Sequence, residues 1–319
     1  MILAPEVLAI LILNSIFLLF SLVAFFLSFK ISFGWDMNAT TKEQYSLEKQ
    51  SYLGATIIKY IFAIKLPLFL FFIFTLDKIS TLLTGAMCAA GVVDATDYGA
   101  YLLILKLLNL YLFGFWLTIH YLDIKNPTLP YTKVKFEFFM VAFIFLLIEI
   151  VLEGVMFYSI DINKMVSCCG TLYSSSSTSA IAGIFSIDKS LLLTVFYGNF
   201  ILIVTFYIMK YRYLFAIVNL SFLIVALISL IQFFGTYIYQ LPTHHCPFCF
   251  LQRDYYYIGY LLYTLLFLGT FYGMRVGVID MLGEKDKSGL KISLWCNFLY
   301  VILVTGYVII YFIENGVWL

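Results

Sequence analysis

Residues 5–32 read PEVLAILILNSIFLLFSLVAFFLSFKIS, a run in which only Glu6 and Lys30 carry a charge. An α-helix rises about 1.5 Å per residue, so a helix of this length crosses the roughly 30 Å of hydrocarbon in a bilayer. The run lacks a basic segment before it and an A-x-A cleavage site, so we expect a retained helix rather than a removed signal peptide. The stretch therefore predicts a transmembrane span.

Further runs of this kind predict a membrane protein with a helical bundle. Only 12% of the 319 residues are charged and 63% are hydrophobic, and the mean hydropathy is +0.99. A soluble domain carries about 25% charged residues. The fold class that we expect is all-α, a polytopic membrane helical bundle with about eight transmembrane helices. The other seven predicted spans are 51–76, 99–121, 137–158, 190–210, 213–239, 249–273 and 292–313.

The basic residues predict the orientation of these spans. One set of alternate connections holds twelve Lys and Arg residues and the other holds four, which are Lys78, Lys164, Lys189 and Arg253. Cytoplasmic loops carry the excess of basic residues, so both termini are expected outside. The net charge of +1 gives no indication of nucleic-acid binding, and the lipid bilayer is the expected surrounding.

We expect two parts along the chain, with a single bundle as the alternative. Residues 1–212 would hold helices 1–5 and two long outer loops, and residues 213–319 would hold helices 6–8. The predicted outer loops contain or adjoin five of the six cysteines, namely Cys88, Cys168, Cys169, Cys246 and Cys249. Disulfides form and persist on the outer side of a membrane, so this distribution favours redox chemistry or structural bridges.

The most informative segment is His-His-Cys-Pro-Phe-Cys-Phe-Leu-Gln-Arg, residues 244–253. Its C-x-x-C pair stands where a loop is expected to enter the seventh span, with Cys246 near the N-cap and Cys249 in the first turn. Unpaired N–H groups and the helix dipole would stabilise a thiolate there. Arg253 would lie four residues after Cys249 on the same helix face, near the membrane interface.

Residues 246–253 resemble the C-P-L-C-x-x-Q-R signature of the bacterial disulfide-bond-forming membrane oxidases, which are related in mechanism to vitamin K epoxide reductase. The resemblance covers the motif and the helix after it. It implies a quinone-linked thiol oxidase, in which Cys246 and Cys249 form the redox pair and Arg253 lies at the quinone. A periplasmic thiol protein would be the partner, and a bacterial inner (cytoplasmic) membrane would be the location. In that family a second cysteine pair follows the motif, whereas here a second pair must come from upstream.

The auxiliary cysteines Cys88, Cys168 and Cys169 leave two interpretations open. Neighbouring cysteines seldom bridge each other without strain, so Cys88 with Cys168 or Cys169 is the more plausible disulfide. The remaining thiol could then exchange with the C-x-x-C pair in a relay. Alternatively, these cysteines only tie the two long loops together.

Two other classes of function compete with thiol redox chemistry. His244 and His245 beside the C-x-x-C pair could form a soft-metal site for copper or zinc in a metal-binding or transporter-like protein. A structural membrane subunit, whose cysteines only connect loops, is the third possibility.

Several ionisable side chains lie inside the predicted spans, where an unpaired charge is costly. Glu149 and Glu153 are four residues apart and share a helix face, and Lys106 is expected at a depth similar to that of Glu153. We therefore expect a Lys106–Glu153 ion pair, which either orients the helices or belongs to a proton path or transport site. His120 is expected to reach towards water at the end of its span. We single out no G-x-x-x-G pair among the small residues of the spans.

Overall fold

The computed structural model describes residues 3–36, 39, 41–161, 166 and 187–319. Eight helices in this part of the chain are long and apolar enough to cross a membrane, and no β-strand occurs among the same residues. The predicted all-α architecture with eight spans is therefore confirmed. The placement of both termini outside stays a prediction.

The chain divides into two compact units, Met1–Val166 and Ser167–Leu319. Each unit contains four of the membrane-spanning helices. The sequence placed the boundary near residue 212, after the fifth span. The structure instead groups the fifth span with the later three, because this helix packs against the sixth one.

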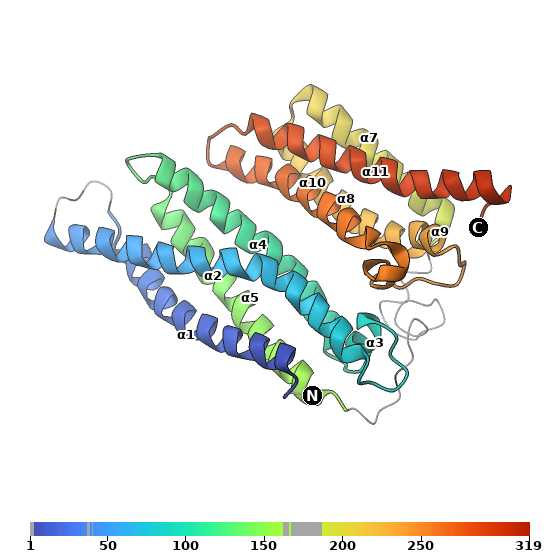
Figure 1. Ribbon diagram of the computed structural model, residues 1–319. Helices are drawn as coiled ribbons and strands as arrows, with labels where there is room; N and C mark the ends of the chain where they lie inside the picture. The colour runs from blue at the N-terminus through green and yellow to red at the C-terminus, as the bar shows by residue number, and fades with distance from the viewer. Residues whose placement is uncertain (1–2, 37–38, 40, 162–165, 167–186) are drawn as a thin grey trace. The chain divides into compact units, whose positions relative to one another are not determined.

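Unit 1 is an antiparallel bundle of four long helices (Figure 1). Helix α1 packs against α2 and α5, and α4 packs against α2 and α5. The short helix α3 lies in the connection from α2 to α4. The elements of unit 1 are α1 (Pro5–Gly34), α2 (Lys42–Ser80), α3 (Ala89–Asp94), α4 (Gly99–Lys125) and α5 (Thr132–Ser159).

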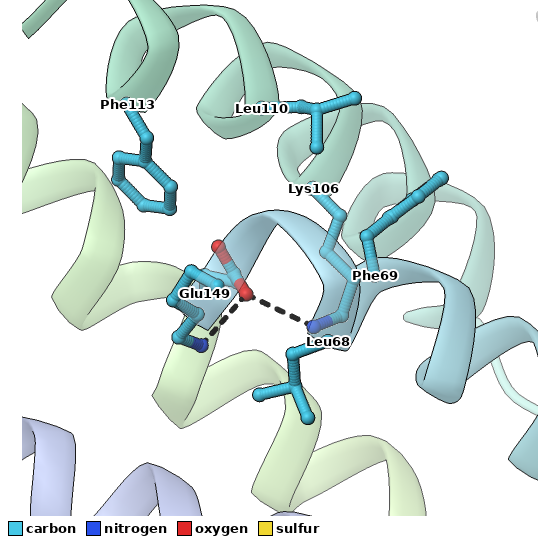
Figure 2. Close-up of a pocket in the computed structure, with 7 residues that line it drawn as sticks. Leu68, Phe69, Lys106, Leu110, Phe113 and Glu149 are labelled. Atoms are coloured by element: carbon cyan, nitrogen blue, oxygen red, sulfur yellow. Dashed lines mark hydrogen bonds and ion pairs between the residues drawn. The ribbon is translucent and has the colours of Figure 1, made fainter. Parts of the chain in front are cut away.

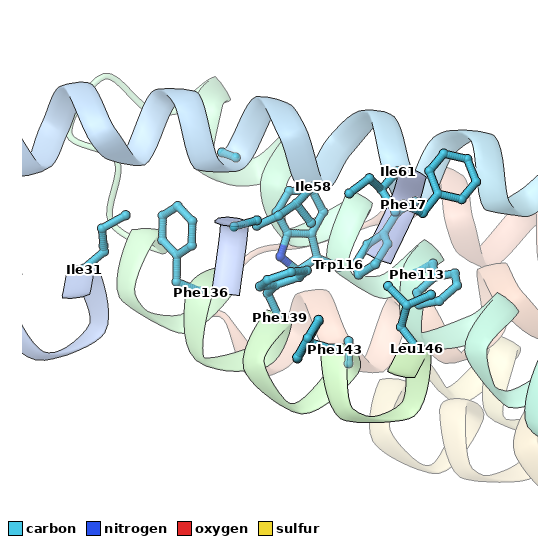
Figure 3. Packing of buried hydrophobic residues seen from close by; sticks show 14 of the residues in the cluster. Phe17, Ile31, Ile58, Ile61, Phe113, Trp116, Phe136, Phe139, Phe143 and Leu146 are labelled. Atoms are coloured by element: carbon cyan, nitrogen blue, oxygen red, sulfur yellow. The ribbon is translucent and has the colours of Figure 1, made fainter. Parts of the chain in front are cut away.

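Aromatic side chains fill one part of the unit 1 core (Figure 3). The Phe62 ring on α2 stacks on Phe113 of α4 with 4.2 Å between centroids, and it meets Trp116 edge-on at 5.5 Å. The Trp116 indole N–H donates to the Lys135 carbonyl at 2.8 Å, so its polar edge is satisfied as well. His120 stacks on Trp116 and is only 7% exposed. The expectation that His120 reaches water was therefore wrong, because the Trp116 ring holds the imidazole inside the bundle.

Unit 2 is also built from four membrane-spanning helices. Helix α10 packs against both α8 and α11, and α7 packs against α8. The sixth span contains a π-helical turn, η1, between α8 and α9. The elements are α7 (Lys189–Met209), α8 (Arg212–Ser229), η1 (Leu230–Phe234), α9 (Gly235–Tyr239), the 3₁₀ turns η2 (Cys249–Leu251) and η3 (Arg253–Tyr255), α10 (Ile258–Met281) and α11 (Lys287–Asn315).

Glycines at every fourth position let the helices of unit 2 approach closely. A Cβ atom on Gly269 would lie 2.1 Å from Oδ1 of Asn297 on α11, and one on Gly273 would lie 2.2 Å from Cγ of Asn219 on α8. Gly277 faces Ala216 on α8 in the same way, at 2.5 Å. These three glycines form a G-x-x-x-G-x-x-x-G repeat on α10, a spacing known for close helix packing in membranes. The sequence interpretation overlooked this repeat.

Candidate functional site

The C-x-x-C segment of unit 2 lies in the irregular connection between α9 and α10. Helix α9 ends at Tyr239, because Gln240 adopts a left-handed conformation with φ of 55°. Cys249 opens the 3₁₀ turn η2, and Gln252 is extended between η2 and η3. Helix α10 begins only at Ile258, nine residues after the predicted start at 249. The prediction that the cysteines cap a long helix was therefore wrong.

Tertiary hydrogen bonds through one tyrosine explain this local geometry. The Tyr239 hydroxyl donates to the Cys246 carbonyl oxygen and accepts from the Phe250 N–H at 3.1 Å. Its ring stacks against Phe250 with 5.6 Å between centroids. The backbone groups on either side of the motif are thus fixed by a side chain rather than by the ladder of a continuous helix.

A second tyrosine and a glycine hold the motif against the first turns of α10. The Tyr263 hydroxyl donates to the Pro247 carbonyl oxygen at 2.7 Å. At Gly259, an added Cβ would lie 2.5 Å from the Phe250 ring and 2.9 Å from the Phe250 carbonyl oxygen. The motif therefore packs tightly on α10, even though it does not belong to that helix.

The two sulfur atoms are close together and shielded from solvent. The Sγ atoms of Cys246 and Cys249 lie within 4.8 Å of each other. The side chains are 1% and 7% exposed, respectively. The Phe248 N–H donates to Cys246 Sγ at 3.4 Å. A short closing movement is enough to form a disulfide, since bonded sulfurs lie about 2.05 Å apart.

Arg253 occupies a separate turn from the cysteines. Its side chain is exposed, as are the neighbouring Tyr256 and Tyr257, of which Tyr256 is 92% exposed. Because Gln252 interrupts the helical path, the expectation that Arg253 and Cys249 share one helix face was wrong. A guanidinium and exposed aromatic rings at the start of α10 nevertheless suit a ring that carries carbonyl groups, so the residue types fit a quinone.

The two histidines make contacts within unit 2. His245 Nδ1 lies 3.1 Å from the carbonyl oxygen of Ile231 in η1, so this nitrogen carries the hydrogen and donates it. The His244 ring meets Tyr239 edge-on at 4.3 Å, and its buried Nε2 has no hydrogen-bond partner among the described residues. Within the described residues of unit 2, no third His, Cys, Asp or Glu ligand atom joins the two sulfurs as a metal site.

The remaining cysteines belong to other segments of the chain. Cys88 is the buried residue that precedes α3 in unit 1. Cys168 and Cys169 lie outside the described residues, so their expected bridge to Cys88 stays a prediction. Cys296 is partly buried on α11.

The structure adds two residues that the sequence interpretation missed, Tyr239 and Tyr263. Both lie in tyrosine-rich stretches at span ends, where aromatic residues are expected at the membrane interface. Tyr239 lies seven residues before Cys246, and this spacing does not indicate a contact unless the fold is known.

The chain matches no protein-family model, no curated protein and no solved structure. The fold defines it as a polytopic α-helical membrane protein. Any more specific function has to be argued from the site itself.

Proposed function

We propose that this chain is an integral membrane thiol–disulfide oxidoreductase in which Cys246 and Cys249 form the redox pair. One observation carries the proposal: the two sulfurs of a C-x-x-C segment lie within 4.8 Å of each other in a segment held by tertiary contacts. Reversible dithiol chemistry requires such proximity together with a backbone that tolerates both redox states. The lysine and arginine distribution supports an outer-face location. The resemblance of residues 246–253 to the bacterial oxidases is the ground for proposing a bacterial inner membrane.

The proposed reaction transfers two electrons from a partner dithiol. A partner thiolate attacks one sulfur of the Cys246–Cys249 disulfide, which forms a mixed disulfide and releases the other cysteine as a thiolate. The second partner thiolate then attacks the partner's own sulfur in the mixed disulfide. The products are an oxidised partner and the reduced pair, with the two protons of the partner thiols transferred to the cysteines or to water.

Several contacts of this segment support a thiol–disulfide cycle at Cys246 and Cys249. The Phe248 N–H donates to Cys246 Sγ and favours the thiolate that leaves when the disulfide opens. Tyr239 and Tyr263 donate to the backbone carbonyls of Cys246 and Pro247 within the motif, and Tyr239 also accepts from the Phe250 N–H after it. These contacts hold the segment, so the two cysteines stay near each other after reduction. Burial of both sulfurs requires that the segment open before a partner protein can reach them.

A quinone is the oxidant that we propose for the reduced pair. When bound, this group supplies a two-electron acceptor that also takes up two protons. The exposed Arg253 is the residue that would donate hydrogen bonds to one of its carbonyl oxygens. Tyr256 and Tyr257 are exposed beside it and offer ring surface to an aromatic ligand.

The proposal predicts quinone-dependent oxidation of a dithiol by the purified full-length protein in lipid vesicles. With dithiothreitol and a short-chain quinone, one quinone should be reduced for each dithiothreitol oxidised. C246S and C249S should each abolish this reaction, because a single thiol cannot close the disulfide. C296S is the matched control and should keep the wild-type rate.

Arg253→Gln separates the quinone side of the reaction from the thiol side. A hydrogen bond from a charged donor contributes about 1.5–3 kcal/mol, so we expect the KM for quinone to rise about tenfold or more. Reduction of the Cys246–Cys249 disulfide by dithiothreitol should be unchanged in this variant.

Three results would overturn the proposal. The first is a Cys246–Cys249 pair that stays oxidised in dithiothreitol or stays reduced with quinone. The second is labelling by membrane-impermeant reagents that locates residues 240–257 on the cytoplasmic side. The third is a stoichiometric metal in the purified protein that is lost in a His244→Ala/His245→Ala double variant, which would favour the soft-metal function instead.

A further inference from the structure

Unit 1 contains a buried charge cluster that the proposed redox function does not use. Its six side chains come from all four long helices of the unit, and none is more than 7% exposed. They form a continuous set of hydrogen bonds and ion pairs. The members are Asn14 on α1, Lys65 on α2, Lys106 and Asn109 on α4, and Glu149 and Glu153 on α5.

Both oxygens of Glu149 are bound. Its Oε1 accepts from Lys65 Nζ at 3.0 Å and from Lys106 Nζ at 2.9 Å, and its Oε2 accepts from Asn109 Nδ2 at 2.5 Å. Figure 2 shows this carboxylate between the two ammonium groups, with dashed lines to each. Glu149 is therefore held as an anion by two opposite charges.

Glu153 is bound on one side only. Its Oε2 accepts from Lys106 Nζ at 2.9 Å and from Asn14 Nδ2 at 2.7 Å. Its Oε1 is buried and has no hydrogen-bond partner among the described residues. A buried carboxylate oxygen without a partner is costly, and its lone pairs are open to a proton.

Lys106 connects the two carboxylates. The predicted Lys106–Glu153 ion pair is confirmed, and the same Nζ also contacts Glu149 at 2.9 Å. If Glu153 takes up a proton, Lys106 keeps a complete ion pair with Glu149. The cluster thus has two charge states that preserve the main contacts, one with Glu153 ionised and one with it neutral.

A small pocket adjoins the cluster (Figure 2). It is lined by Lys65, Lys106 and Glu149 together with apolar residues of α2 and α4, and its free space of ≈ 10 Å³ is sufficient for about one water molecule. Pro67 lies two residues after Lys65 on α2. Proline has no N–H group, so it cannot donate the usual helical hydrogen bond to the carbonyl of Ala63. Helix α2 changes direction in its second half (Figure 1).

The size and charge of the cluster limit what it can bind. Two ammonium groups beside the pocket disfavour a metal cation, and two carboxylates disfavour an anion. The free space is too small for an organic ligand. A proton needs no free space of its own and is the species that fits.

We propose that the buried charge cluster is an intramembrane proton-binding site, with Glu153 Oε1 as the atom that gains and releases the proton. On uptake, a proton moves from water to Glu153 Oε1, the cluster gains one positive charge, and Lys106 remains paired with Glu149. On release, the proton returns to water and the Lys106–Glu153 ion pair is restored.

The other charged groups of unit 1 lie outside this cluster. Lys59 on α2 is exposed. Asp123 and Lys135 form their own ion pair at the α4–α5 turn, where Asp123 also accepts from the Thr132 hydroxyl at 3.0 Å. The groups that face Glu153 are therefore Lys106 and Asn14, with Lys65 one contact further away through Asn14.

Infrared difference spectroscopy of the full-length protein in lipid tests this proposal. Acidification should produce the C=O stretching band of one buried carboxylic acid, and carboxyl ¹³C-labelled glutamate should lower its frequency. Glu153→Gln should remove the band, because the amide cannot be protonated in this range. Glu314→Gln is the matched control on an exposed glutamate of α11 and should retain it.

The wild-type spectrum alone can refute the proposal, even if Glu153→Gln does not fold. Absence of a glutamate band that responds to pH would show a cluster that only orients the helices. A band that persists in folded Glu153→Gln protein would assign the proton to another residue. The measurement uses neither thiol nor quinone, so its result is independent of the redox proposal.

Discussion

The two units bury polar side chains inside their spans by different means. Unit 1 uses full charges, with two lysines and two glutamates joined through Lys65–Glu149, Lys106–Glu149 and Lys106–Glu153 contacts of 2.9–3.0 Å. Unit 2 uses neutral amides, since Asn219 Oδ1 accepts from Asn297 Nδ2 at 2.8 Å and from Ser293 Oγ at 3.2 Å. Its ion pairs among the described residues, Arg212–Asp280 and Arg275–Asp286, each include a residue at the start of a helix, because Arg212 begins α8 and Asp286 caps α11.

This difference indicates which interactions stabilise each bundle. A hydrogen bond between amide side chains of two helices contributes modestly to the stability of a membrane protein. In unit 2 these hydrogen bonds occur beside the glycine repeat, which lets α8 and α11 approach α10 closely. Buried ion pairs are weak evidence of a stabilising role, because a protein in which apolar residues of similar size replace them is often equally stable. Their presence in unit 1 therefore favours a role in proton chemistry over a role in packing.

The largest effect on stability is expected for Lys106→Met. The change removes the ammonium group that contacts Glu153 and should lower the free energy of unfolding in detergent by about 3–5 kcal/mol. Lys133→Met, at an exposed site in the first turn of α5 of the same bundle, is the control and should change it by no more than about 0.5 kcal/mol. In Lys106→Met/Glu153→Gln, a partial recovery is expected because the uncompensated charge is gone. Equal losses for the single and double variants would contradict the ionic account of unit 1.

An intermediate effect is expected for Gly273→Leu in unit 2. A Cβ at this position would already lie 2.2–2.5 Å from the Asn219 side chain, so α8 and α10 must separate, at a cost of about 1–3 kcal/mol in unfolding free energy. Gly306→Leu is the matched control, because a Cβ at Gly306 meets nothing within 4 Å. If both variants unfold at the same denaturant concentration, close packing at the glycine repeat is not what stabilises unit 2.

The smallest effect is expected for Asn297→Ala. Interhelical hydrogen bonds in membranes average about 0.6 kcal/mol, so the unfolding free energy should fall by roughly that amount through loss of the Asn219 contact. Asn199→Ala is the control, because Asn199 donates only to Val195 within its own helix. A loss for Asn297→Ala as large as that for Lys106→Met would remove the distinction between the two units.

Hydropathy alone determined the class of this protein, the number of its spans and their approximate positions, except for the start of the seventh span. The cost of leaving a backbone N–H or C=O unsatisfied in lipid forces long apolar runs into helices, whatever the neighbouring residues are. The first span was predicted at 5–32 and observed at Pro5–Gly34, and the Lys106–Glu153 pair followed from the cost of isolated charges.

Only the tertiary structure decided how the two candidate sites are built. The start of α10 at Ile258 depends on the Tyr239 hydroxyl, which comes from another helix and binds backbone groups that the local sequence would have placed in a first turn. The inclusion of Asn14, Lys65 and Asn109 in the charge cluster likewise depends on how four helices rotate against one another. Helix rotation is set by the shapes of packed side chains, and hydropathy does not encode it.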